Sequence, residues 1–386
     1  MRIGLVSDTY TPQVNGVTTI VRRIAEALAG GGHDVAIVAP RYPAANGPPG
    51  ALTHELRIPS LPFPPYPAIR LSWPKSGVIA RFLDGFRPDL LHVHTEGPLG
   101  LVTRGYALRR GLPLVTSLHT DFPRYARHYG AAPLAPLVWR WLAWFHAPAS
   151  LTLTPGEAMR ADLERHGIGH ALVWGQGVDP RQFHPSHRDS AWRRWLAGGD
   201  DTVVVLHVGR LAPEKNLEVL IAAWRLARER LGEQATFVIA GEGPLERRVV
   251  AALPFVRQLG FLPRDRLAQL YASSDLCVLP SPTETCGLVA LEAMASGLPV
   301  IAADAGGLRE SVVHNHTGLL VGPQDALGFA AAIEALARDS ERRFRLAAAA
   351  RQRAVERDSV REDAELMDRY AHLVSRDREG AAACAA

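Results

Sequence analysis

Short apolar runs alternate with amphipathic helical patterns from the first residue of the chain. The runs are four to six residues long and predict buried strands, whereas apolar residues at helical spacing predict helices between them. In the first half, the predicted strands are 2–7, 35–39, 90–94 and 113–118, and the predicted helices are 16–29, 76–86 and 97–110. Between them, the proline-rich segment 40–74 is expected to be irregular. This order predicts βαβ units that form a parallel sheet.

The same alternation resumes after a polar, tryptophan-rich stretch at 179–199, which predicts a domain boundary near residue 190. The second set comprises strands 203–208, 236–240, 256–261, 276–280 and 300–303, and helices 217–231, 264–272, 288–296, 330–337 and 341–357. We therefore expect an α/β protein with two doubly wound, Rossmann-like domains, at 1–190 and 191–359. A last helical segment, within 360–386, is a candidate to cross back to the first domain. In such sheets, ligands bind at the carboxyl ends of the strands, here in the expected cleft between the domains.

Size and composition agree with two globular domains. The chain has 386 residues, of which 47% are hydrophobic and 21% charged, and it contains no uncharged apolar run of about eighteen residues that could span a bilayer. Asp8 follows the first apolar run too soon for a signal peptide. Three widely spaced cysteines do not suggest a disulfide framework. These features predict a cytoplasmic protein.

The small net charge is unevenly distributed. Residues 1–189 contain 19 Lys+Arg and 13 Asp+Glu, a net +6, and the remainder contains 24 and 26, a net −2. A basic first half suits an anionic substrate or an anionic membrane surface, and the alternative is a solvated arginine-rich surface. No nucleic-acid motif or basic tract stands out, so nucleic acid is not an expected partner.

The stretch TETCGLVALEAM, residues 283–294, places one acid on a loop and another on the following helix. The N–H groups of Gly287, Leu288 and Val289 are expected at the helix N-terminus, where they could bind an anion. The carboxylates of Glu284 and Glu292 could then accept hydrogen bonds from sugar and ribose hydroxyls. The alternative is that the two acids only compensate the helix dipole.

Two cations lie in GRLAPEKN, directly after the first strand of the second set. Arg210 offers a bidentate fork and Lys215 a point charge, so both could neutralise a diphosphate. If that diphosphate is a leaving group, fixed cations stabilise the transition state more than the ground state. The alternative is a surface loop with helix-capping charges.

Other candidates follow strands in the same way. Gly16, in PQVNGV, could let its N–H approach a phosphate, although Asn-Gly alone would suggest a turn. His119, in SLHTDF, could donate to a sugar hydroxyl, although a lone histidine is more often structural. Asp121 and Glu96 are weaker candidates for the acceptor side. AGEGP, at 240–244, lacks the third glycine of a dinucleotide fingerprint, which disfavours a nicotinamide oxidoreductase.

These motifs together resemble the retaining glycosyltransferases of family 4, which have the GT-B fold. TETCGLVALEAM carries the Glu-x7-Glu spacing, and PQVNGVTTIVRRIAEAL, SLHTDF, HVGRLAPEKNLEVLIAAW, AGEGP and GFLPRDRLAQLYASSD appear in the family's order. The resemblance implies that Arg210 and Lys215 hold the donor pyrophosphate, Gly16 contacts the β-phosphate, His119 contacts the transferred sugar, and the main chain of Phe261 faces the nucleobase. Cys286 stands where the family usually has phenylalanine.

The sequence therefore predicts a retaining hexosyltransferase with catalytic candidates His119, Glu284, Arg210 and Lys215. No Asp-x-Asp occurs, so we expect no metal, and no cofactor besides the nucleotide-sugar donor. The preferred donor is GDP-mannose and the acceptor a glycolipid or glycan; a UDP-glucose or UDP-sulfoquinovose enzyme, or a sugar-nucleotide-binding protein without turnover, are the alternatives. The aromatic segment 135–145 is expected to be core, with contact to the inner face of the cell membrane as the competing hypothesis.

Overall fold

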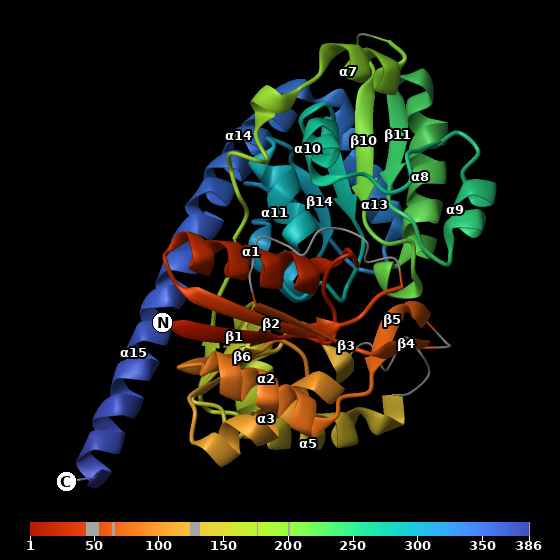
Figure 1. Ribbon diagram of the computed structural model, residues 1–386. Coiled ribbons are helices and arrows are strands. Elements are labelled where there is room, and N and C mark those ends of the chain that lie inside the picture. The colour runs from red at the N-terminus through yellow and green to blue at the C-terminus, as the bar shows by residue number, and fades with distance from the viewer. Residues whose placement is uncertain (44–53, 64–65, 124–131, 176, 200, 386) are drawn as a thin grey trace. The chain divides into compact units, whose positions relative to one another are not determined.

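The computed structural model describes residues 1–43, 54–63, 66–123, 132–175, 177–199 and 201–385, which form two compact domains (Figure 1). The first contains residues 1–123, 133–174 and 360–386, and the second contains 175–359. Residues 175–189, on the amino side of the expected boundary, thus group with the second domain, and the last helix groups with the first. Within the described residues, no helix combines the length and apolar composition that a bilayer span requires.

The first domain is built on a parallel sheet with the order β3-β2-β1-β6-β7-β8-β9. Helix α1 covers one face and α2 and α3 the other (Figure 1). The strands are β1 (Arg2–Val6), β2 (Asp34–Pro40), β3 (His54–Ile58), β6 (Leu90–Val93), β7 (Leu114–Ser117), β8 (Leu151–Thr154) and β9 (Ala171–Val173). The helices are α1 (Gly16–Gly30), α2 (Ser76–Phe86), α3 (Pro98–Arg110), α5 (Ala135–His146), α6 (Glu157–Arg165) and α15 (Ser359–Ala385), with the 3₁₀ turn η1 (Ala132–Leu134).

The expectation that residues 40–74 are irregular is wrong. This segment contains β3 and an antiparallel pair of strands, β4 (Ser60–Phe63) and β5 (Tyr66–Ser72). Prolines are tolerated here because the pair forms a small separate sheet, in which a missing N–H need not interrupt a central ladder. The guanidinium of Arg70 fastens the pair by donating to the hydroxyl of Ser60 at 3.1 Å and to its carbonyl at 2.6 Å.

The second domain is built on a parallel sheet with the order β12-β11-β10-β13-β14-β15. Helices α8 and α13 pack together on one face, and α10, α11 and α14 lie on the other (Figure 1). The strands are β10 (Val203–Val208), β11 (Ala235–Ala240), β12 (Arg257–Gln258), β13 (Leu276–Leu279), β14 (Val300–Ala303) and β15 (Gly318–Val321). The helices are α7 (Ser190–Ala197), α8 (Leu217–Leu231), α9 (Glu246–Ala252), α10 (Arg264–Ala272), α11 (Leu288–Ala295), α12 (Gly306–Ser311), α13 (Ala326–Arg338) and α14 (Ser340–Glu356), with 3₁₀ turns η2 (Pro185–His187), η3 (Pro213–Lys215) and η4 (Gly232–Gln234).

Both sheets reverse their strand order at one point, between β1 and β6 in the first domain and between β10 and β13 in the second. The prediction of two doubly wound α/β domains is confirmed. Loops diverge at the carboxyl side of such a reversal and leave room for a ligand. The two reversal points are therefore where functional side chains are expected.

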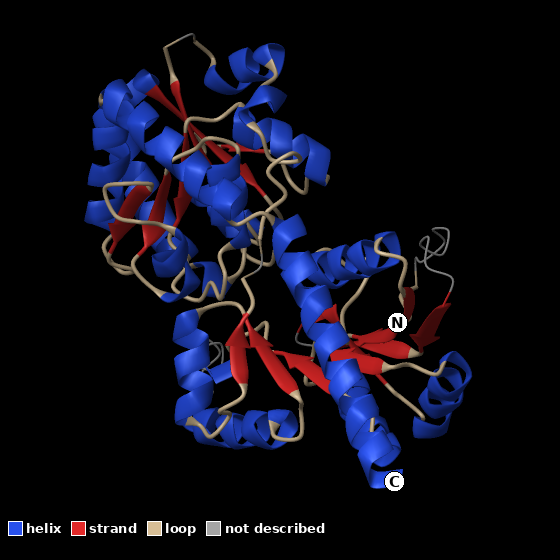
Figure 2. Ribbon diagram, turned by 90° about the vertical axis from the view of Figure 1, so that its left-hand side faces the viewer, coloured by secondary structure: helices blue, strands red, loops and turns tan. Residues whose placement is uncertain are grey.

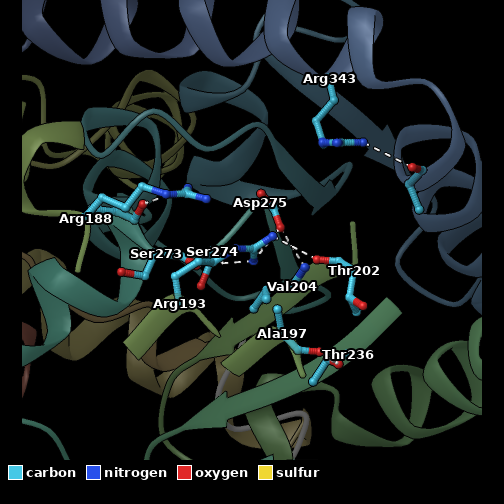
Figure 3. Close-up of polar contacts among 12 residues, drawn as sticks. Arg188, Arg193, Ala197, Thr202, Val204, Thr236, Ser273, Ser274, Asp275 and Arg343 are labelled. Atoms are coloured by element: carbon cyan, nitrogen blue, oxygen red, sulfur yellow. Dashed lines mark hydrogen bonds and ion pairs between the residues drawn. The ribbon is translucent and has the colours of Figure 1, made fainter. Parts of the chain in front are cut away.

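A partly buried ion pair lies at the amino end of the second sheet (Figure 3). Arg193 of α7 lies 2.7 Å from the Asp275 carboxylate and donates to the Thr202 carbonyl at 2.8 Å. The same carboxylate accepts the Val204 N–H at 2.7 Å. Backbone and side-chain partners satisfy these charges from within the domain, so this cluster fixes α7 to the sheet.

Helix α15 completes the first domain and runs across its sheet (Figure 2). Asp363 at its start accepts from Arg23 of α1 at 3.0 Å, and the indole N–H of Trp174 donates to the Glu362 carbonyl at 3.1 Å. Further along the helix, Tyr370 is completely buried. The helix therefore forms part of the interior of the first domain.

Candidate active site

In the second domain, the loops that follow β10 and β13 are tied together at the reversal point. Asn216, in the left-handed conformation at φ 56°, donates its side-chain amide to the carbonyls of Pro280 at 3.0 Å and Pro323 at 2.6 Å. The hydroxyls of Ser281 and Thr283 both donate to the Glu214 carbonyl at 3.1 Å. These bonds hold the GRLAPEKN loop against the TETCG loop.

Two ion pairs lie where these loops meet. Lys215 pairs with Glu284, and both side chains are about four-fifths buried. Burial alone would raise the pKa of Glu284, but the Lys215 charge and hydrogen bonds outweigh it and hold that pKa below its ordinary value. Arg210 pairs with the fully buried Glu214, four residues further on. The structure thus brings the predicted residues Lys215 and Glu284 together, and it adds Glu214 as the partner of Arg210.

Each of these cations is chemically suited to bind a phosphate oxygen as well as a carboxylate. An ammonium has three N–H donors and a guanidinium five. The four charges sum to zero, and an incoming diphosphate would add negative charge to this balance. The alternative of a surface loop with capping charges does not account for Lys215 and Glu284 pairing across two strands.

The N-terminus of α11 begins at a glycine that no other residue could replace without strain. Gly287 has a φ of 72°, and a Cβ there would lie 2.9 Å from Leu308. As the N-cap it places no side chain over the first turn. The N–H groups of Leu288 and Val289 therefore point from the helix end, as an anion site requires.

Glu292 lies further along α11 and faces inward. Its carboxylate accepts from the Tyr271 hydroxyl at 3.3 Å and lies 3.5 Å from the Arg264 guanidinium. Burial raises the pKa of Glu292, against the opposing effects of Arg264 and Tyr271. Dipole compensation does not explain the two acids, because Glu284 is bound to Lys215 and Glu292 lies beyond the first turn. The ribose contact of Glu292 stays a prediction.

The loops around Phe261 are also joined. The main-chain N–H of Phe261 donates to the Glu242 carboxylate at 3.1 Å, and the ring is half exposed. A backbone bond from Gly241 to the Gly260 carbonyl, 2.8 Å, links the AGEGP and GFLP segments. A nucleobase contact through the Phe261 main chain stays a prediction, and its N–H already has an acceptor.

His207, in β10, is a buried residue near this site that the sequence reasoning did not select. Its Nδ1–H donates to the Val278 carbonyl at 2.8 Å, so its Nε2 carries a lone pair. Among the described residues, that Nε2 has no hydrogen-bond partner. Burial lowers the pKa of His207 to about 4, with a smaller contribution from Lys215. The ring is therefore neutral, close enough to Lys215 and Glu284 to feel their charges.

In the first domain, Asp8 joins the two strands at the reversal point. Its N–H donates to the Thr95 hydroxyl, which donates back to the Asp8 carboxylate, both at 2.8 Å. The carboxylate also accepts the Leu99 N–H at 3.0 Å, so it caps α3. Burial raises the pKa of Asp8 to about 6 despite these bonds.

Gly16 is the first residue of α1, and the preceding Asn15 is the helix cap. The Asn15 side chain accepts from the Thr18 N–H and donates to the Thr9 hydroxyl, both at 2.8 Å. Gly16 therefore stands at a capped helix start, with its N–H among the donors that have no partner within the helix. The β-phosphate contact stays a prediction.

His119 lies next to a second histidine. Its Nε2 is 3.1 Å from Nδ1 of His94, and the two rings are stacked with centroids 5.4 Å apart. Burial lowers the pKa of His119 to about 4 and that of His94 well below its ordinary value. Both imidazoles are therefore neutral near pH 7, so each carries one N–H.

The two weaker candidates lie in the interior. Asp121 is buried, and the Glu96 carboxylate lies 3.3 Å from His146 Nε2 at the end of α5. Nδ1 of His146 is 2.8 Å from the Thr116 hydroxyl. The contact with His146 gives the Glu96 side chain a structural role in the interior. Acceptor contacts by Asp121 and Glu96 stay predictions.

The aromatic segment 135–145 forms α5 and is divided between two environments. Leu142 and Phe145 are buried as a core residue should be, whereas Leu137, Trp141 and Trp144 are exposed. These three follow one side of the helix, at spacings of four and three residues. The expectation of a core segment is therefore right for only part of α5.

Two family models match the chain, one in each half. A model described as "Glycosyltransferase Family 4" matches residues 14–182, and one described as "Glycosyl transferases group 1" matches residues 190–353. A "GDP-mannose-dependent alpha-mannosyltransferase" from Mycolicibacterium smegmatis is 37% identical over 340 residues, which are 87% of this chain and 87% of that protein. The chain belongs to glycosyltransferase family 4.

Other similar proteins agree with this assignment. "Sulfoquinovosyl transferase SQD2" from Arabidopsis thaliana is 35% identical over 303 residues, 76% of this chain and 58% of that protein. The solved structure of a sucrose-phosphate synthase from Thermosynechococcus elongatus has a TM-score of 0.80 and 23% identity, and covers 97% of this chain and 99% of that chain. The glycosyltransferase therefore has the GT-B fold, as the sequence predicted.

Sequence reasoning about this glycosyltransferase missed the residues that hold its predicted site residues in place. Glu214 could have been found, because it stands four residues after Arg210 at a spacing typical of ion pairs. Tyr271 and His207 lie in apolar patterns that look like core. Tyr370, described below, is 278 residues from its partner His92, and no local pattern connects them.

Proposed function

We propose that this glycosyltransferase moves an α-mannosyl group from GDP-mannose to a hydroxyl of a glycolipid or glycan, with retention at the anomeric carbon and without a divalent metal. Arg210, Lys215 and the N-terminus of α11 would hold the diphosphate, with Gly16 at the β-phosphate. Glu284 and His119 would hold the sugar, Glu292 the ribose and Phe261 the base. Transferase activity itself follows from the family.

The Lys215–Glu284 pair at the reversal point is the observation that carries this proposal. It couples a cation suited to a diphosphate with a carboxylate suited to sugar hydroxyls, from two neighbouring strands. In a nucleotide sugar, the diphosphate is joined to the sugar ring by the anomeric carbon–oxygen bond. One pair of side chains would thus bind both sides of the bond that breaks.

For the chemistry, we favour departure and attack on the same face of the sugar. The bond between the anomeric carbon and the diphosphate oxygen breaks, and the acceptor oxygen forms the new bond. The leaving phosphate oxygen takes the proton of the acceptor hydroxyl. Negative charge grows on the diphosphate as it departs, where Arg210 and Lys215 stabilise it in place of a metal.

The choice of mannose rests on the M. smegmatis relative, whose name specifies GDP-mannose. It is tested by thermal shift with GDP-, UDP- and ADP-sugars in the presence of EDTA, followed by mass spectrometry of products. We expect GDP-mannose to give the largest stabilisation and a mannosylated product. Loss of turnover with EDTA, restored by Mg²⁺, would contradict the metal-independent reaction.

A UDP-sugar donor is the second candidate, supported by the 35% identity to the sulfoquinovosyl transferase. In the same panel, it predicts stabilisation by UDP-glucose or UDP-sulfoquinovose above that by GDP-mannose. A protein that only binds sugar nucleotides would be stabilised but would yield no product from any donor and acceptor.

We also propose that the enzyme works at the cytoplasmic surface of a membrane, where α5 meets the lipid. Leu137, Trp141 and Trp144 expose apolar area, and Arg104 of the adjacent α3 stacks on Trp144 at 4.0 Å. Helices α3 and α5 contain four arginines and neither Asp nor Glu. An apolar stripe beside cations suits an anionic interface.

Cosedimentation with lipid vesicles tests this surface. We expect binding to vesicles that contain phosphatidylglycerol, and weak binding to phosphatidylcholine alone. Replacing Trp141 and Trp144 by serine should abolish it, whereas Trp195→Ser, at an exposed position on α7, should not. Equal binding by both variants would exclude α5 as the contact.

A further inference from the structure

Buried hydrogen bonds, together with one ring contact, connect the C-terminal helix with the candidate site in the first domain. The Tyr370 hydroxyl of α15 is 2.5 Å from Nδ1 of His92, and Nε2 of His92 is 2.7 Å from the Ser117 hydroxyl. His92 and Ser117 lie on the neighbouring strands β6 and β7, close to their carboxyl ends. His92 is therefore held at both ring nitrogens.

The His92 ring contacts the pair that includes His119. The His92 and His94 centroids are 3.7 Å apart with the planes tilted by 38°, and His94 is in turn stacked on His119. Rings at this centroid distance are in van der Waals contact, so the orientation of His92 restricts that of His94. The position of His94 therefore depends on the hydroxyl that α15 supplies.

The hydrogen bonds also fix where the protons lie. Nε2 of His94 is buried and has no hydrogen-bond partner within the described part of the chain. A buried N–H without an acceptor is costly, so the single proton of neutral His94 belongs on Nδ1. That N–H donates to Nε2 of His119. His119 must then carry its own proton on Nδ1.

We propose that Tyr370 is a positioning residue for His119. By holding His92, it keeps His94 in the orientation that donates to Nε2 of His119, and so it makes His119 a donor at Nδ1 only. This inference rests on the proposed contact between His119 and the transferred sugar. The last helix of the chain thereby takes part in the reaction without touching the substrate.

The simpler explanation is that Tyr370 only packs the interior, and a matched tyrosine separates the two. Tyr106, on α3 of the same domain, is also buried, and its hydroxyl donates to Asp84 at 2.8 Å. Tyr370→Phe and Tyr106→Phe each remove one hydroxyl and one hydrogen bond. We expect both full-length variants to melt a few degrees below the wild type, by similar amounts.

Kinetics should then distinguish them. For Tyr370→Phe we expect kcat to fall about tenfold with the KM of the donor within twofold, and for Tyr106→Phe we expect kcat within twofold of the wild type. In a His119→Ala background, Tyr370→Phe should cause no further loss. An additive loss in that background, or equal kcat values for the two phenylalanine variants, would overturn the proposal.

Imidazole ¹⁵N spectra of the enzyme without substrate give a test that does not need turnover. The wild type should show His119 protonated at Nδ1 and not at Nε2, and Tyr370→Phe should show a mixture of tautomers. If the spectra change while no donor is turned over, the proposed donor is wrong and the positioning role stands. If transfer proceeds and the spectra of the two enzymes agree, the positioning role is wrong.

Discussion

The two domains hold their candidate site residues by opposite electrostatic means. In the first, His92, His94 and His119 are buried and neutral: His92 is hydrogen-bonded to two hydroxyls, His94 is hydrogen-bonded to His119, and the rings of His92 and His94 are in contact. In the second, Lys215 and Glu284 remain charged and neutralise each other. In the neutral rings, the tautomer decides which nitrogen donates a hydrogen bond. The paired charges act on a ligand electrostatically.

This difference matches what each part of a nucleotide sugar requires. A sugar hydroxyl is neutral and needs a donor or acceptor in the right place, which a fixed tautomer provides. A departing diphosphate gains charge and needs cations that are already oriented. Changes in the second domain should therefore cost more activity and depend on salt, and changes in the first should depend on geometry.

The largest effect is expected for Lys215→Ala. Loss of the ammonium removes a diphosphate ligand and leaves Glu284 without its cation, so kcat/KM should fall about 10³-fold, or about 4 kcal/mol. Steady-state kinetics at two ionic strengths measure this loss and its salt dependence. Lys75→Ala, at the exposed start of α2, is the control and should be unaffected. A loss below tenfold would remove Lys215 from the site.

Glu284→Gln should have the next largest effect and should separate binding from transfer. The amide keeps the shape but loses the charge, so kcat should fall about 10²-fold. The nucleoside diphosphate itself should bind more tightly, because Lys215 no longer shares its charge with a carboxylate. Calorimetric titration measures this affinity. The control Glu218→Gln, in an exposed pair with Arg248 on the second domain, should change neither kcat nor the affinity for the nucleoside diphosphate. An unchanged kcat for Glu284→Gln would exclude the proposed role of Glu284.

A smaller effect, on stability, is expected from the neutral histidine in the first domain. His119 binds a proton near pH 4 when folded and near 6.5 when unfolded, so the free energy of unfolding falls as the pH drops from 6.5 to 4. At pH 5 the loss from this group is about 2 kcal/mol relative to pH 7. Asp8 has a raised pKa and opposes this loss.

The comparison of wild type with His119→Gln isolates the contribution of His119 to the pH dependence of stability, because glutamine does not titrate and the Asp8 contribution cancels. Urea unfolding at pH 7 and at pH 5 gives, for each protein, the change in the free energy of unfolding between the two pH values. The variant should lose about 2 kcal/mol less than the wild type between these pH values. An equal loss in both proteins would mean that His119 titrates normally in the folded state.

The smallest effect is expected for Tyr271→Phe. The Tyr271 hydroxyl donates to Glu292 at 3.3 Å, so its removal frees the carboxylate to turn while Arg264 stays beside it. The donor KM should rise about threefold, less than 1 kcal/mol, with kcat unchanged. A tenfold loss of kcat would place Glu292 in the chemical step instead of in donor binding.

Elements with a clear period could be predicted from the sequence, and short or proline-containing ones could not. The bounds of α2, α10 and β14 agree with the expected ranges. The four-residue strand β15 was missed because it is short and begins with Gly318, a residue type that is depleted in strands. Only glycine fits there, because a Cβ would lie 2.1 Å from the Val300 carbonyl oxygen. Strands β4 and β5 were missed because each contains a proline, which usually argues against a strand.

Within the site, motifs located the residues but not their partners. Glu284 and Lys215 were both selected, yet the sequence contains no sign that they pair, because 69 residues separate them. The histidine chain was missed for a different reason. His92 and Tyr370 each occupy a position that looks like ordinary core, and only the three-dimensional arrangement joins them.

The membership of α15 in the first domain has a consequence for biosynthesis. Ribosomes release a chain from its start, and domains usually fold in that order. Here residues 1–174 emerge without the helix that carries Tyr370, whereas all of 175–358 emerges before that helix does. We expect the later half of the polypeptide to mature before the earlier one, and a nascent chain stalled before residue 360 to leave its opening segment sensitive to protease.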